Sequence, residues 1–160
     1  MSPDNGKRKM TTPDRSTHLQ FLRTHRLASV SSVGPAGGPQ AAAVGIAVSD
    51  SLEIVFDTLS SSRKAHNFAR EPRVAMVIGG LQEGEEQTVQ LEGIADVPSG
   101  AELERLKQVY YATWPDGPSR LSWPGLIYVR VRPTWLRYSD YRSTPPMIVE
   151  FDAEALAGLE

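Results

Sequence analysis

Stretches in which apolar and polar residues alternate recur along this sequence, and alternation with period two predicts β-strands. Runs of turn-forming residues, such as Gly34–Pro39, separate them. The expected strands lie at 27–33, 41–48, 52–58, 73–78, 87–97, 126–132 and 135–138, and 148–151 is expected to be an edge or dimer-arm strand. Short strands joined by hairpin turns are typical of an antiparallel barrel.

Two longer segments have the spacing of amphipathic helices. The first is expected to start with Thr12 as N-cap and to end near His25, and the second spans 100–112 behind a Ser99–Glu102 capping box. His18 and His25 lie seven residues apart on the first helix. We expect both to be partly exposed, because no further metal ligand lies close by in the sequence.

The most informative stretch is the junction between the strand ending at Phe56 and a short helix. Ser62 and the two serines before it are N-cap candidates, Arg63 and Lys64 open the helix, and Pro72 ends it after about two turns. Ala65, Phe68 and Ala69 are its expected buried face.

Cations in a first helical turn are unfavourable, because the N-terminal end of a helix already carries partial positive charge. Serine hydroxyls, free helix N–H groups and the charges of Arg63 and Lys64 together favour a phosphate-binding site. The alternative is a solvated basic turn beside a serine-rich loop. Broken local rules are expected at functional sites, which favours the phosphate.

The expected strand at 41–48 has one almost bare face, formed by Ala41, Ala43, Gly45 and Ala47. Such a face lets a flat group approach the backbone, and it equally suits tight packing against a neighbouring element. The pattern alone leaves both interpretations open.

Composition excludes several classes of protein. The chain has 160 residues, 40% of them hydrophobic, and a net charge of −2, which suits one globular domain and argues against nucleic-acid binding. Without cysteine there is no disulfide, no thiolate nucleophile and no Cys-ligated metal, and we expect no metal site. No apolar run is long enough to cross a membrane, so we expect a cytoplasmic protein without membrane contact.

We expect three segments. Residues 1–12 are predicted to form a disordered tail, 13–151 a single domain, and 152–160 a C-terminal helix or tail.

Phe56, Thr58, Ser62-Arg63-Lys64 and Glu71-Pro72-Arg73-Val74 resemble the flavin-binding segment of the pyridoxamine phosphate oxidase family, with Glu71 as a mild departure. The strand order extends this resemblance over residues 14–141. It implies a mainly β fold with flanking helices: a six- or seven-stranded antiparallel split β-barrel. It further implies a homodimer that binds FMN noncovalently, with the cofactor sites at the dimer interface.

The resemblance also implies which residues contact the cofactor. Thr58, Ser62, Arg63 and Lys64 are expected at the phosphate, and the ring is expected beside a strand that hydrogen-bonds it through its backbone. Thr88 aligns with a Gln that family members commonly present to the flavin, and Gln90 points to the same side. The complete expected set is Ala43, Val44, Gly45, Thr58, Ser62, Arg63, Lys64, Thr88 and Gln90.

Two departures set this chain apart from the vitamin-synthesising oxidases. Ala42 stands where they place an Arg that helps hold the flavin phosphate, and Ser139 is the nearest match to their C-terminal Trp. Both departures favour a relative of those enzymes. The loop 113–125 is long, and Trp114 or Trp123 is a candidate wall of a substrate pocket.

The leading functional hypothesis is an oxidoreductase that transfers hydride between FMN and a small-molecule substrate. The sequence identifies neither the substrate nor a catalytic acid or base. One alternative keeps the fold and replaces FMN with a deazaflavin, whose phosphate-containing tail uses a related basic site. Another is a flavin or haem carrier or sensor without turnover.

Overall fold

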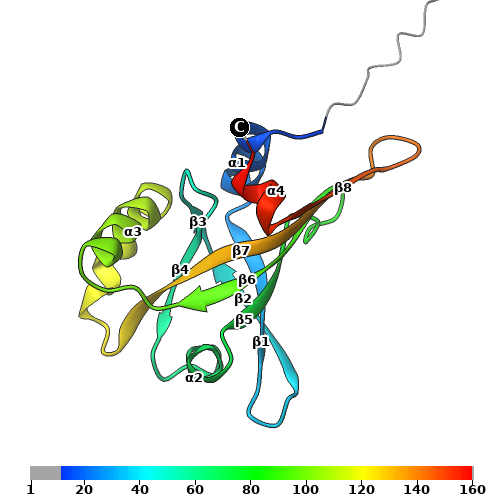
Figure 1. Ribbon diagram of the computed structural model, residues 1–160. Coiled ribbons are helices and arrows are strands. Elements are labelled where there is room, and N and C mark those ends of the chain that lie inside the picture. The colour runs from blue at the N-terminus through cyan, green and yellow to red at the C-terminus, as the bar shows by residue number, and fades with distance from the viewer. Residues whose placement is uncertain (1–11, 160) are drawn as a thin grey trace, which may run out of the picture.

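The computed structural model describes residues 12–159, in which eight strands form one antiparallel sheet with helices around it (Figure 1). The strands are β1 (Leu27–Val33), β2 (Pro39–Gly45), β3 (Ala47–Val48), β4 (Ile54–Leu59), β5 (Arg73–Ile78), β6 (Gln87–Asp96), β7 (Leu126–Asp140) and β8 (Met147–Asp152). The helices are α1 (Arg15–Thr24), α2 (Arg63–Arg70), α3 (Gly100–Thr113), the 3-10 helix η1 (Gly117–Ser122) and α4 (Ala153–Ala157). The expected mainly β fold is confirmed. Most of the tail predicted to be disordered, residues 1–11, lies outside the described part.

Neighbouring strands follow the order β2-β1-β5-β6-β7-β4-β3, and β8 also pairs with β7. The expected count of six or seven strands is wrong. The strand expected at 41–48 breaks at Ile46 into β2 and β3, because the chain there leaves β1 and pairs with β4. The two strands expected at 126–132 and 135–138 form the single strand β7, and β8 is a full member of the sheet.

Pro133 is the reason that β7 bends without ending. Gly93 pairs with Pro133 while Glu92 pairs with Trp135, so Thr134 is an extra residue in β7. The register shift is a bulge, which is typical at a proline because proline lacks an N–H group for the ladder. The first part of β7 pairs with β4 and its last part with β8, both on the side opposite β6.

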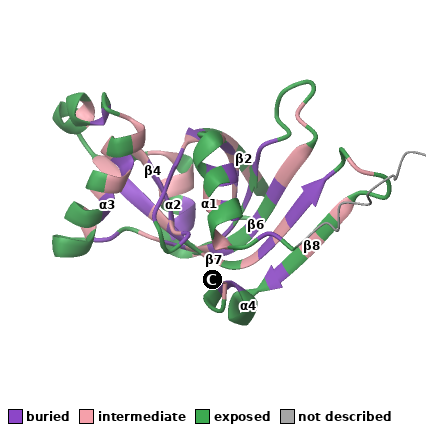
Figure 2. Ribbon diagram, turned by 90° about the horizontal axis from the view of Figure 1, so that it is seen from above, coloured by how far each residue is buried: buried purple, intermediate pink, exposed green. Residues whose placement is uncertain are grey.

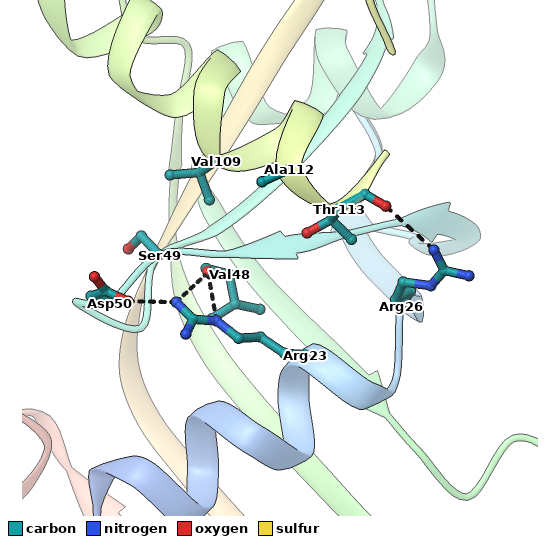
Figure 3. A pocket seen from close by; sticks show the side chains of 8 residues that line it. All are labelled: Arg23, Arg26, Val48, Ser49, Asp50, Val109, Ala112 and Thr113. Atoms are coloured by element: carbon teal, nitrogen blue, oxygen red, sulfur yellow. Dashed lines mark hydrogen bonds and ion pairs between the residues drawn. The ribbon is translucent and has the colours of Figure 1, made fainter. Parts of the chain in front are cut away.

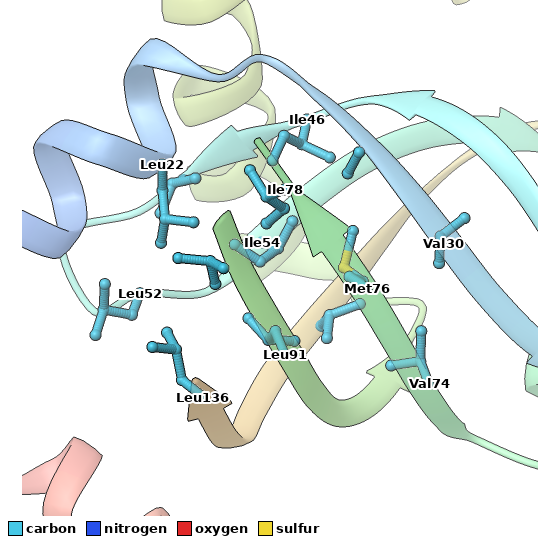
Figure 4. Packing of buried hydrophobic residues seen from close by; sticks show 14 of the residues in the cluster. Leu22, Val30, Ile46, Leu52, Ile54, Val74, Met76, Ile78, Leu91 and Leu136 are labelled. Carbon is cyan, nitrogen blue, oxygen red and sulfur yellow. The ribbon is translucent and has the colours of Figure 1, made fainter. Parts of the chain in front are cut away.

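The sheet curls around the hydrophobic core, and each strand turns one face inward. In β5, the residues Val74, Met76 and Ile78 are buried while their neighbours are exposed. Figure 4 shows these side chains converging with Leu22 of α1 and Leu91 of β6. Burial therefore alternates along strands such as β1 and β5 and forms a stripe on the helices (Figure 2), whereas Ile54, Val55 and Phe56 of β4 are buried in succession. No helix within residues 12–159 is long and apolar enough to cross a membrane.

Two helix starts differ from expectation. Asp14, not Thr12, is the N-cap of α1, and its carboxylate accepts a hydrogen bond from the Thr17 amide at 2.8 Å. Ser99 makes no side-chain cap bond. The expected partner in its capping box, Glu102, instead accepts hydrogen bonds from Arg105 at 3.1 Å and Arg130 at 2.9 Å. A charge-assisted bond to a guanidinium is stronger than one to a neutral amide, so the ion pairs prevail.

His18 was expected to be partly exposed, and that is wrong. Its side chain is fully buried between the rings of Tyr138 and Phe151, with centroids 5.8 and 4.9 Å away. Neither ring nitrogen has a hydrogen-bond partner among residues 12–159. The last strands close over this face of α1, a long-range contact that helical spacing does not reveal. Burial lowers the pKa of His18 below its usual 6.5.

We predict that His18 makes the protein sensitive to acid. Because its folded-state pKa is depressed, the unfolded chain binds more protons below about pH 6.5, so the free energy of unfolding falls as pH decreases, by at most about 1.4 kcal/mol per pH unit. Urea denaturation at pH 7.5 and 5.0 measures the loss. His18→Phe is expected to remove this component, while the exposed control His66→Gln retains it; equal pH dependence in wild type and His18→Phe would contradict the assignment.

Candidate functional site

Helix α2 places two cations at a cavity of about 250 Å³. Arg63 and Lys64 line it together with Val30 and Ser32 of β1 and residues 40–42 of β2. Neither cation has a carboxylate partner within the described residues, whereas most other arginines there do. Ala42, which aligns with the missing arginine, is part of this lining. The cavity therefore offers uncompensated positive charge beside a bare strand.

The local sequence determines the start of α2. Ser62 is the N-cap, and its hydroxyl accepts from the Ala65 amide at 3.3 Å and from the Thr58 hydroxyl at 3.1 Å. The structure thus brings Thr58 and Ser62 into contact, directly before Arg63 and Lys64. Four of the expected site residues form one group, although in this arrangement Ser62 stabilises the helix.

A polar network that the sequence did not reveal fixes α2 against the sheet. Buried Asn67 donates to Ser32 at 2.9 Å and to the Gln40 amide oxygen at 2.8 Å. If the side-chain amide of Gln40 is flipped by 180°, its oxygen accepts a hydrogen bond from Nε of Arg63 at 3.2 Å. The expected buried face of α2 is correct only for Phe68, since Asn67 is buried and Ala69 is exposed. An apolar pattern cannot identify a buried asparagine, because its partners lie about 30 residues away.

Among the strands of the described chain, β2 has a hydrogen-bonded neighbour on one side only. Two hydrogen bonds flank the β1–β2 ladder: the Ile46 amide donates to the Arg26 carbonyl at 2.8 Å, and the Gly34 amide donates to the Gly38 carbonyl at 2.8 Å. Hydrogen-bonded pairs alternate along an antiparallel ladder, so it is the even-numbered residues of β2 whose backbone groups bond to β1. The backbone groups of Ala41, Ala43 and Gly45 therefore point to the free edge. Val44, also expected at the cofactor, points its backbone to β1 and its side chain into the core.

The bare face of β2 serves two purposes. At Gly45 a Cβ atom would lie 2.8 Å from Cζ2 of Trp114, whose indole N–H donates to the Ile46 carbonyl at 2.9 Å. Packing against a neighbouring element is therefore the explanation at this position. Ala41 and Ala43 remain exposed, so the part of the strand open to a flat group lies next to the basic cavity.

Thr88 and Gln90 lie apart from this group. Residues that pair across neighbouring strands lie on the same face of a sheet. The pairs that lead across the sheet are Gln90 with Val77, Val77 with Ser29, and Ser29 with Ala43. Thr88 and Gln90 therefore lie on the same outer face as Ala43 of β2. Three strand spacings of about 4.8 Å separate them from β2, roughly 14 Å in all. Within one chain neither side chain lines the basic cavity.

The C-terminal segment near Tyr138 forms its own polar cluster. Asp140 is buried and accepts from both the backbone and the guanidinium of Arg142, whose hydrogen bonds lower the pKa of Asp140. Ser139 is buried as well. Of the two tryptophans considered as pocket walls, Trp114 lines a cavity of about 580 Å³, while Trp123 is exposed.

A curled antiparallel half-barrel with a short basic helix beside its open edge defines the split-barrel class. The sequence model described as pyridoxamine 5'-phosphate oxidase matches residues 15–140, and the chain belongs to that family. The resemblance seen in residues 56–74 is thus confirmed. No curated protein matches the chain.

Solved structures share the fold at low sequence identity. A haem-binding protein from Mycobacterium smegmatis aligns with a TM-score of 0.78 and 16% identity, over 94% of this chain. The chain spans only 63% of that protein's length. A conserved hypothetical protein from Mycobacterium tuberculosis gives 0.68 at 25% identity, over 84% of this chain and 89% of the other. A pyridoxamine 5'-phosphate oxidase-related, FMN-binding protein from Nostoc punctiforme gives 0.64 at 15% identity, over 86% and 87%.

We predict that Gly45→Ala destabilises the protein by about 1 to 3 kcal/mol, because the added methyl group collides with the fixed Trp114 indole. Gly38→Ala is the matched control, since nothing lies within 4 Å of the new Cβ atom. Urea unfolding of both variants measures the difference. Equal stabilities would show that Trp114 does not occupy this position in solution.

Proposed function

We propose that this protein is a homodimeric oxidoreductase that binds FMN noncovalently and transfers hydride between the flavin and a small molecule. The observation that carries the proposal is a pair of cations, Arg63 and Lys64, that have no carboxylate partner among residues 12–159 and face a cavity beside the free edge of β2. Family membership and the fold shared with an FMN-binding protein support the choice of cofactor.

The donors in the basic cavity suit a phosphate group. A phosphate dianion takes charge-assisted hydrogen bonds from a guanidinium and an ammonium, and the first amides of α2 add partial positive charge. The Ser62 hydroxyl can donate its proton while accepting from Ala65. Without an arginine at Ala42, Arg63 and Lys64 supply the full charges of the site.

The edge of β2 suits the rest of the cofactor. From Ala41 to Gly45 the strand covers four residue steps of about 3.3 Å, or roughly 13 Å, and presents unpaired backbone donors and acceptors along that length. An extended ligand with its phosphate at Arg63 would place a flat heterocycle along this edge, above Ala43. When bound, the flavin supplies the redox chemistry, and the chain's residues bind and orient it.

Two other cofactors share part of this support. A deazaflavin with a phosphate-containing tail would use the same cations. The similarity to the Mycobacterium smegmatis protein supports haem, but none of the residues that line the basic cavity is a His, Cys, Met or Tyr, the usual axial ligands of haem iron. We therefore favour a flavin, and the absorbance spectrum of the purified protein distinguishes the three.

Replacing Arg63 and Lys64 by Ala is expected to weaken FMN binding at least a hundredfold, since two charge-assisted contacts of about 1.5 to 3 kcal/mol each are lost. The apo protein should become about 0.6 to 2 kcal/mol more stable, because the clash of both cations with the helix dipole disappears. Flavin fluorescence titration and urea unfolding measure the two effects.

The control is Arg73→Ala with Arg132→Ala, which removes two exposed arginines that do not line the basic cavity. Its FMN affinity should match wild type. Unchanged FMN affinity in the Arg63 and Lys64 variant would place the phosphate elsewhere and remove the main support for the proposal.

A homodimer explains why Thr88 and Gln90 lie far from the basic cavity of their own chain. The outer face between them and β2 holds Ser29, Ala75 and Val77, which are small or uncharged and partly exposed. If two such faces pack together, β6 of one protomer approaches β2 of its partner. Shared faces of this kind are typical of two-fold dimers.

We predict that light scattering gives a mass of two chains and that Val77→Lys, which buries a charge in the proposed interface, yields monomers with FMN affinity reduced at least tenfold. Arg73→Lys on the same strand keeps the charge and should leave the dimer intact. A wild-type monomer that binds FMN at micromolar concentration would refute the interface.

A further inference from the structure

A second cavity, of about 580 Å³, lies on the outer face of the sheet. It is enclosed by the end of α1, the β5–β6 hairpin and Trp114. Ala43 belongs to its lining and also to the free edge of β2, so under the proposed function the cavity begins where the ring of the cofactor would lie. A reacting substrate has to lie beside that ring.

One wall of this cavity is flat and rigid. The Trp114 indole is held by its hydrogen bond to the Ile46 carbonyl at 2.9 Å and by its contact with Gly45. The guanidinium of Arg26 covers the indole, with Cζ 4.9 Å from the ring centroid. Because the guanidinium already lies over the indole, a planar ligand would gain dispersion and stacking energy against this Arg26–Trp114 pair, which is ordered before binding.

The positive charge at this wall belongs to the Arg26 guanidinium, which has donors left for a ligand. Arg26 makes one side-chain hydrogen bond, to the Thr113 carbonyl at 3.3 Å, and no ion pair within residues 12–159. Its neighbour Arg23 is different, because Asp50 lies 2.6 Å away and Val48 accepts two further bonds (Figure 3). Arg26 therefore retains donors for an anionic group.

Another part of the cavity lining, Glu85, supplies hydrogen-bond acceptors. One carboxylate oxygen of Glu85 accepts from the amides of Leu81 and Gln82, at 2.9 and 3.2 Å. The other lies 3.7 Å from Nε2 of His25. This part of the lining disfavours a second anion and suits an N–H or O–H group, so an anionic ligand binds in one orientation.

We propose that this cavity binds the substrate, and that the substrate is a planar conjugated anion that lies against Trp114 with its anionic group at Arg26. The role as substrate rests on the proposed function, whereas the binding of a planar anion does not. It follows from the wall, the free guanidinium and the Glu85 acceptors alone.

The experiment titrates the full chain, with and without FMN, with 2-naphthoate and with its neutral analogue 2-naphthamide. The indole N–H resonance of Trp114, assigned by its loss in Trp114→Phe, reports binding. We expect a saturable shift with 2-naphthoate and at least tenfold weaker binding of 2-naphthamide, because one charge-assisted contact is lost.

Arg26→Gln is expected to weaken 2-naphthoate binding at least tenfold and Arg26→Lys to restore most of it. Arg23→Gln is the matched control and should bind as wild type, because Arg23 lines only the neighbouring cavity, whereas Arg26 lines both. Glu85→Gln should bind 2-naphthoate equally well or more tightly.

Either of two results overturns the proposal: no Trp114 shift with 2-naphthoate, or equal affinities for wild type and Arg26→Gln. Flavin titration of the same samples separates the two hypotheses. FMN binding without 2-naphthoate binding refutes the cavity alone. Absence of FMN binding refutes the proposed function alone, because the titration without FMN still tests the cavity.

Discussion

The architecture depends on the change of partner at Ile46. Its amide still bonds to Arg26 at 2.8 Å, as in the β1–β2 ladder, while its carbonyl accepts from Trp114 at 2.9 Å. The next residues pair with β4. Because β2 therefore has only one hydrogen-bonded neighbour within residues 12–159, the sheet stays open along Ala41 and Ala43 and presents backbone groups that a closed barrel would have used.

Helix α2 brings charge to that opening at an energetic cost. Two cations in its first turn oppose the helix dipole, by about 0.3 to 1 kcal/mol each. The Ser62 cap, the bonds of Asn67 to β1 and β2, and the contact of Phe68 with Phe56 offset this cost. Structural packing thus maintains a local arrangement that the isolated segment disfavours, as is expected of a binding site.

The expected site residues fall into two groups according to the strand on which they lie. Thr58, Ser62, Arg63 and Lys64 meet because the end of β4 leads directly into α2, which is a local feature of the chain. Ala43 lies on β2 directly after Ala41 and Ala42, which line the same cavity as Arg63 and Lys64. The β6 residues stay three strands away, since the order β2-β1-β5-β6 separates them whatever their side chains are.

The sequence by itself determined the positions of most strand residues, the three longer helices, the family and the basic junction at 62–64, because these depend on residue spacing, caps and charge within short segments. Only the tertiary structure decided that His18 is buried, that Trp114 covers Gly45 and that Glu102 binds arginines. Each depends on partners far along the chain: Phe151 for His18, Trp114 for Gly45 and Arg130 for Glu102. Local periodicity carries no information about such partners, because they come into contact only when the sheet curls.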